Sequence, residues 1–197
     1  MNPKVIINFV MFQLAWFACV IGAAKGYPSI GLVVTFAAVI WHLYNAHHYR
    51  AELLLLLIAF AIGATFDQTL LSNHLVDYAH HGWGENSLNS MLVPTWILAL
   101  WVGFATSLNV SLRWMHDKYL VAIIFGAIGG PVAYMAAEKL GAVTLNTTTS
   151  YFALSIGWAI ITPMLLIISS KFDGYQAINK AESAPKLAMS KALKGLK

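Results

Sequence analysis

Six stretches of mainly apolar residues, separated by short polar or charged segments, make up most of residues 1–170. A helix that crosses the hydrocarbon core of a bilayer needs roughly 20 such residues. Residues 53–57 and 121–124 are apolar without interruption, whereas the strands of a membrane β-barrel alternate apolar and polar positions. We therefore predict an all-α membrane domain. Its six transmembrane helices are expected at residues 5–24, 29–44, 52–71, 93–112, 120–137 and 151–169.

The composition favours a membrane protein over a soluble domain. Hydrophobic residues make up 59% of the chain and charged residues only 10%, whereas about a quarter of the residues in soluble domains are charged. The single cysteine, Cys19, excludes a disulfide within one chain and a metal site built from several cysteines. The first apolar stretch contains Asn8 and Gln13 and is longer than a typical signal-peptide core, so we expect it to remain as the first helix.

The basic residues predict how the helices are oriented. With six helices, both ends of the chain lie on the same side of the membrane. Of the 12 Lys and Arg residues, only Lys25 and Lys139 fall on the opposite side. Because cytoplasmic loops carry an excess of Lys and Arg, we expect both termini in the cytoplasm.

Residues 171–197 are expected to form a basic cytoplasmic tail. Its lysines outnumber its acids by four, which equals the net charge of +4 of the entire chain. From Ser183 onward, apolar and lysine side chains fall on opposite faces of a helical wheel, a pattern typical of an amphipathic helix on an anionic membrane surface. A flexible solubilising tail explains the same composition, and both interpretations stay open.

Asp67 is the clear exception to the placement of charges outside the apolar stretches. An ionised carboxylate in that position costs roughly 3 kcal/mol, so such acids face a protein interior or a wet cavity. His74 and His81 follow at steps of seven residues, with Asp77 and His80 nearby. Three roles stay open: a structural acid between helices, a proton relay or substrate contact, and a metal ligand. Because no established ligand motif is present, the metal ligand is the least favoured of these roles, and we assign no metal site and no cofactor.

A second group of polar residues is expected at the cytoplasmic side of the helices. Arginine offers a planar fork suited to phosphate or carboxylate, and His, Glu and Asn can orient a headgroup or move a proton. Polar residues at helix ends are also common for structural reasons. We favour a site because several members lie within apolar stretches. The predicted substrate-binding residues are Asn8, Gln13, His42, Glu52, Asn109 and Arg113.

Glycines interrupt the fifth apolar stretch. Gly126 and Gly130 have the GxxxG spacing that lets helices approach closely, and Pro131 follows directly. We interpret this segment as a packing kink, and the two glycines as a candidate contact for an oligomer or a partner helix.

Several short motifs occur together along the chain. They are Asn8, Gln13, Trp16, Gly22–Ala23, Pro28 and Gly31; Pro94–Thr95–Trp96, Leu100–Trp101 and Phe104–Ala105; Ser111–Leu112–Arg113–Trp114; and Gly126, Gly129–Gly130–Pro131 and Tyr134. As a set, they resemble a family of small bacterial inner-membrane proteins catalogued only as a domain of unknown function. The resemblance covers residues 8–168 and leaves out the tail. It implies a multi-pass protein of the bacterial cytoplasmic (inner) membrane and supplies no catalytic residues.

Three functions follow as hypotheses, and the sequence does not decide whether the chain is an enzyme. The first is binding or modifying a lipid or lipid-like substrate near the inner leaflet. The second is a non-catalytic subunit of a membrane complex. The third is a small proton-coupled transporter in which Asp67 titrates. Membrane lipids are the expected partners, and no nucleic acid is expected.

Overall fold

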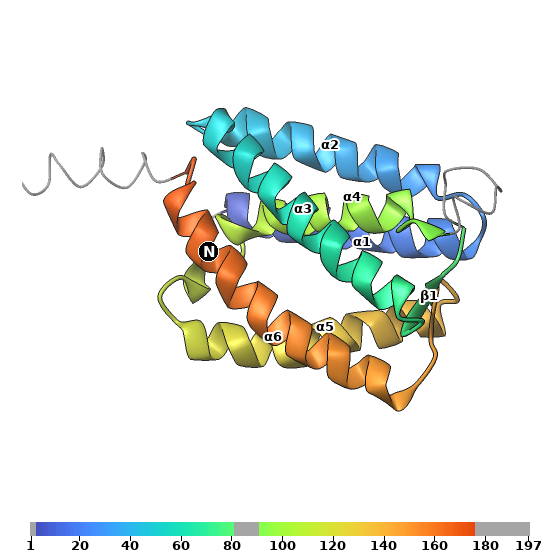
Figure 1. Ribbon diagram of the computed structural model, residues 1–197. Helices are drawn as coiled ribbons and strands as arrows, with labels where there is room; N and C mark the ends of the chain where they lie inside the picture. The colour runs from blue at the N-terminus through green and yellow to red at the C-terminus, as the bar shows by residue number, and fades with distance from the viewer. Residues whose placement is uncertain (1–2, 81–90, 176–197) are drawn as a thin grey trace, which may run out of the picture.

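The computed structural model describes residues 3–80 and 91–175, in which six helices run alternately in opposite directions (Figure 1). The helices are α1 (Pro3–Ala24), α2 (Ser29–Asn45), α3 (Tyr49–Ser72), α4 (Thr95–Leu108), α5 (Tyr119–Lys139) and α6 (Thr148–Lys171). A short 3₁₀ helix, η2 (Arg113–Met115), and two strands, β1 (Val76–Tyr78) and β2 (Val143–Leu145), complete the described elements. The prediction of a mainly helical chain is confirmed. His81 and the predicted amphipathic helix of the tail lie outside the described residues.

Four of the described helices, α1, α3, α5 and α6, are long and apolar enough to cross a membrane. The helices α2 and α4 are shorter, with 17 and 14 residues. At a rise of 1.5 Å per residue, α4 is about 21 Å long, which is less than the roughly 30 Å of a hydrocarbon core. The prediction that this helix continues to residue 112 was wrong. The N–H groups of Val110 and Leu112 both bond back to the carbonyl of Ser107, which ends the helix in a turn.

The short helix α4 lies at the centre of the bundle (Figure 1). Most of its residues are buried, and it packs against α1, α2 and α3. Its side chains therefore contact other helices on nearly all sides. This position explains why α4 supplies several of the aromatic residues described below.

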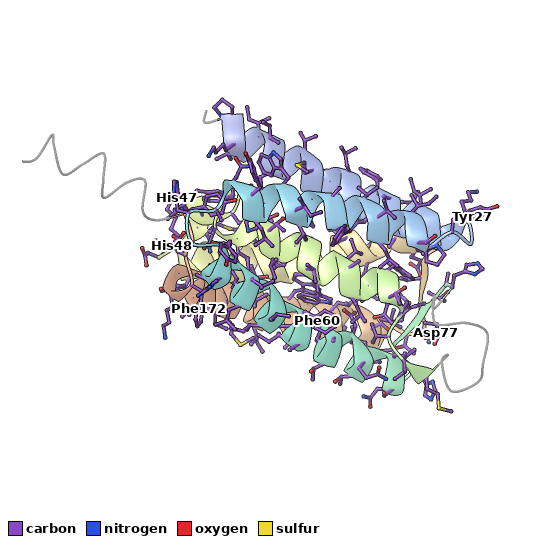
Figure 2. The ribbon with its side chains drawn as sticks, turned by 90° about the horizontal axis from the view of Figure 1, so that it is seen from above. Tyr27, His47, His48, Phe60, Asp77 and Phe172 are labelled. Atoms are coloured by element: carbon purple, nitrogen blue, oxygen red, sulfur yellow. The ribbon has the colours of Figure 1, made fainter. Side chains whose placement is uncertain are left out.

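The two ends of the bundle carry different segments. The N-terminus and the C-terminal end of α6 lie at one end, together with His47, His48 and Phe172 (Figures 1 and 2). We call this the terminal end. Tyr27 and Asp77 lie at the opposite, strand end (Figure 2). Among the described Lys and Arg residues, those at the strand end are Lys25 and Lys139, and those at the terminal end are Lys4, Arg50, Arg113, Lys118 and Lys171.

A pair of short antiparallel strands closes the strand end. β1 and β2 pair with Val76 opposite Leu145 and Tyr78 opposite Val143. In both strands the outer two residues are buried and the middle one is exposed. This alternation of apolar and polar residues is visible in the sequence, but three residues are too few to predict a strand. The pair ties the segment after α3 to the segment between α5 and α6.

Glycines set the close contact between α5 and α6. A Cβ atom added to Gly126 would lie 2.1 Å from the carbonyl oxygen of Trp158, and one added to Gly130 would lie 2.2 Å from the Trp158 ring. The predicted GxxxG face is therefore occupied by α6 of the same chain. Pro131 lies inside α5 without ending it.

Candidate functional site

An apolar cavity of about 330 Å³ lies between α1, α4, α5 and α6. Trp101 of α4 and Trp158 of α6 stack in its wall, with ring centroids 4.8 Å apart and planes 9° from parallel. Phe104 meets both rings edge-on. Cavities that bind small molecules have volumes of about 300–1,000 Å³ and mainly apolar walls. The size and the lining are therefore those of a small ligand site.

The cavity opens on the outer surface of the bundle between α1 and α5. Phe17 of α1 lines it and is 46% exposed, and Phe125 and Val132 of α5 line it and are 44% and 56% exposed. Space is available here because α5 carries glycine at position 129, where a larger side chain would fill it. A Cβ atom on Gly129 would meet only the Phe125 ring, at 4.0 Å.

Asp67 of α3 also lines this cavity and is 0% exposed. The hydroxyl groups of Tyr78 and Tyr134 donate hydrogen bonds to its Oδ1, the former at 2.6 Å. The indole N–H of Trp101 donates to its Oδ2 at 2.5 Å. A buried carboxylate is stable only when such donors replace the water it has lost. The three donors come from β1, α5 and α4, so Asp67 joins three elements to α3.

His74 and His80, which follow Asp67 in the sequence, do not share a helical face with it. α3 ends at Ser72, and both His74 and His80 have positive φ angles, 53° and 46°. The carboxylate of Asp77 accepts a hydrogen bond from the amide of Asn146 at 2.9 Å. Within residues 3–80 and 91–175, no three His, Cys, Asp or Glu side chains are grouped closely enough to hold a metal ion.

A second buried acid, Glu52, lies at the terminal end. Its Oε2 is 2.9 Å from Nε2 of His42, and its Oε1 accepts hydrogen bonds from the Asn109 amide at 2.9 Å and from the Gly174 N–H at 2.7 Å. The hydroxyl of Tyr175 donates to the carbonyl of His42 at 2.6 Å. The pKa of Tyr175 is raised, mainly by burial and further by the nearby Glu52 carboxylate.

We call the group formed by His42, Glu52, Asn109, Gly174 and Tyr175 the terminal cluster. Arg113 completes it from the outer side. Its guanidinium donates to the carbonyl of Asn109 at 3.2 Å and forms an ion pair with Asp173. Burial raises the pKa of Asp173, although the Tyr175 N–H and the Arg113 charge act in the opposite direction. The cluster therefore links α2, α3, α4 and the segment after α6.

The structure divides the six predicted substrate-binding residues into three places. His42, Glu52, Asn109 and Arg113 belong to the terminal cluster. Asn8 is buried elsewhere, where its amide donates to the carbonyl of Thr106 at 3.0 Å and ties α1 to α4.

Gln13, the sixth residue, lines the apolar cavity. The sequence did not predict that Asp173, Gly174 and Tyr175, which follow α6, contact the terminal cluster, because nothing in their spacing relates them to Glu52. The same holds for Tyr78, Trp101 and Tyr134 around Asp67.

The terminal cluster is filled by the chain itself. His42 and Glu52 are 0% exposed and Asn109 is 1% exposed. A Cβ atom on Gly174 would already lie 2.7 Å from Cγ of Glu52. A ligand at Glu52 would have to displace the segment after α6 that contains Gly174. The cavity beside Asp67 is therefore the better candidate site.

Comparison with known proteins assigns the chain to a family but does not indicate an activity. No curated protein and no solved structure matches the chain. The family described as "Protein of unknown function (DUF2878)" matches residues 5–164, a range that contains all the described residues lining the cavity. Since this match covers most of the chain, the protein belongs to the DUF2878 family.

Proposed function

We propose that this chain is a multi-pass protein of the bacterial inner membrane that binds a lipid-like molecule in the cavity between α1, α4, α5 and α6. The observation that carries the proposal is the aromatic-lined cavity of about 330 Å³. An apolar ligand that moves from water into such a cavity is stabilised by about 25 cal/mol per Å² of apolar surface buried. A lipid-like molecule gains less, because it is already in lipid, so shape and polar contacts must select it.

The ligand enters from the bilayer. The exposed rim of the cavity is formed by Phe17, Phe125 and Val132, which lie on α1 and α5. Both helices are long and apolar enough to span a membrane. With these helices in a bilayer, the opening faces the acyl chains of the lipids, and a ligand reaches it without crossing water.

All six helices cross or enter the bilayer in this proposal, with the terminal end in the cytoplasm. The excess of Lys and Arg at the terminal end supports this orientation. α2 and α4 need not span the full hydrocarbon core, because they pack against longer helices that do.

The other two hypotheses have weaker support. Proton-coupled transport requires Asp67 to gain and lose a proton, yet both of its oxygens accept hydrogen bonds from fixed donors. A partner helix at Gly126 and Gly130 would have to replace α6. A structural role for Asp67 and a contact within the chain for the glycines account for these features directly.

Gly129→Leu tests the proposal because it fills the cavity from a position with free space. We expect the purified variant to retain about tenfold less lipid than the wild type, since forcing a ligand into the reduced cavity would overpack it at a cost of about 1–3 kcal/mol. The bound molecules are measured by native mass spectrometry and identified after extraction.

Ile128→Phe is the matched control. Ile128 precedes Gly129 on α5, is 61% exposed and does not line the cavity. The Ile128→Phe variant should retain as much lipid as the wild type. Equal retention by Gly129→Leu and wild type, or a wild-type protein that carries no lipid at all, would reject the proposal.

A further inference from the structure

Two polar atoms in the cavity wall have no hydrogen-bond partner among the described residues. They are Nε1 of Trp158 and Oγ1 of Thr162, and both are buried. Trp158 and Thr162 are four residues apart on α6, which puts them on the same face of the helix. A buried donor without a partner costs about 1–3 kcal/mol. These atoms therefore indicate where a ligand would supply an acceptor.

The cavity wall also limits the charge of its ligand. None of the described residues lining it is Lys, Arg or His, and Asp67 is its one carboxylate. A phosphate or carboxylate on the ligand would meet this acid without a compensating cation. An ammonium group would have to compete with Tyr78, Trp101 and Tyr134 for the oxygens of Asp67. An uncharged polar group avoids both costs.

We infer that the cavity selects an uncharged lipid whose carbonyl or ether oxygen accepts hydrogen bonds from the Trp158 indole N–H and the Thr162 hydroxyl. This inference rests on the proposed function and adds the chemical class of the ligand. The apolar chain lies against Phe104 and leaves the cavity between α1 and α5. A neutral ester and a quinone share this acceptor chemistry, and the mass of the ligand carried by the wild-type protein distinguishes them.

The test compares four probes with the same hydrocarbon chain: methyl palmitate, palmitate, palmitylamine and hexadecane. Each is deuterium-labelled and added at neutral pH to the full-length protein in phosphatidylcholine nanodiscs, and the bound fraction is measured by native mass spectrometry. We expect methyl palmitate to bind more tightly than the other three. Thr162→Val, which keeps the shape of the side chain, should lower its affinity by between about twofold and tenfold and leave hexadecane unchanged.

Thr95→Val is the matched control. The Thr95 hydroxyl is also buried without a partner among the described residues, but it does not line the cavity. The Thr95→Val substitution should leave the preference for methyl palmitate unchanged. Trp158→Phe is a second test variant that removes the other donor, and it should reduce the same preference.

The outcomes separate this inference from the proposed function. If methyl palmitate and hexadecane bind equally, or if a charged probe binds most tightly, while Gly129→Leu lowers the binding of every probe, the inference is wrong and the proposed function stands. If Gly129→Leu changes the binding of no probe, both fail. A loss of methyl palmitate binding in Thr162→Val and in Trp158→Phe, with Thr95→Val unchanged, supports both.

Discussion

At the scale of single residues, two buried acids organise the molecule in different ways. Asp67 accepts hydrogen bonds from side chains of three other elements, whereas Glu52 accepts two of its bonds from Asn109 and the Gly174 backbone. An acid at membrane depth is costly unless such partners are present. The sequence singled out Asp67 by its position within an apolar stretch and included Glu52 among the polar residues expected at the cytoplasmic side. Their partners could not be predicted, because Tyr134 lies 67 residues from Asp67 and Gly174 lies 122 residues from Glu52.

Tyr134→Phe removes one donor from Asp67 and leaves the ring in place. We expect the free energy of unfolding to fall by about 1.5–3 kcal/mol, the usual contribution of a hydrogen bond to a charged group. Denaturant titration in mixed micelles measures the change. Tyr44→Phe is the control, because Tyr44 is 88% exposed and should tolerate the same substitution. Equal stability of the two variants would mean that Asp67 does not depend on the Tyr134 hydroxyl.

At the scale of helices and strands, length and hydrophobicity predicted where the helices lie, and close packing decided their contacts. Each predicted stretch corresponds to a helix, although α4 ends four residues early. The strands β1 and β2 were missed because each is only three residues long. Glycines mark both the closest contacts and the open cavity, and the sequence alone does not distinguish these two uses.

Gly63→Ala and Gly129→Ala separate the two uses of glycine. Alanine is favoured over glycine in a helix by about 1 kcal/mol. At Gly129 the added methyl group meets only the Phe125 ring, at a distance of 4.0 Å, so we expect stability to stay the same or rise. At Gly63 it would lie 1.9 Å from the Trp101 ring, so we expect a net loss of about 1–3 kcal/mol. Thermal denaturation in detergent measures both, and a stabilised Gly63→Ala would contradict the α3–α4 packing.

At the scale of the whole molecule, the alternating helices bring the N-terminus and the end of α6 to the same end (Figure 1). The excess of basic residues at this end predicts that it faces the cytoplasm. The terminal cluster lies at this end, and the strand pair lies at the other. In the proposed orientation, the hydrogen-bonded segment after α6 is therefore on the cytoplasmic side.

Cysteine labelling tests this orientation. His47 and Tyr27 are exposed and lie at opposite ends of the bundle (Figure 2). In a Cys19→Ala background, Tyr27→Cys should react with a membrane-impermeant maleimide in intact bacterial spheroplasts, and His47→Cys only after permeabilisation. Labelling of His47→Cys in intact spheroplasts would reverse the topology.

The sequence by itself determined the class of the protein and the position of its helices, because length and hydrophobicity are local properties of a chain. It also identified Asp67 as unusual, since a charge in an apolar stretch is visible without a structure, whereas Glu52 was predicted only as one member of the polar group at the cytoplasmic side. Only the tertiary structure decided that α4 is central, that the chain itself fills the surroundings of Glu52, and that a cavity lies beside Asp67. These features depend on which helix faces pack together, and residues far apart in the sequence set those contacts.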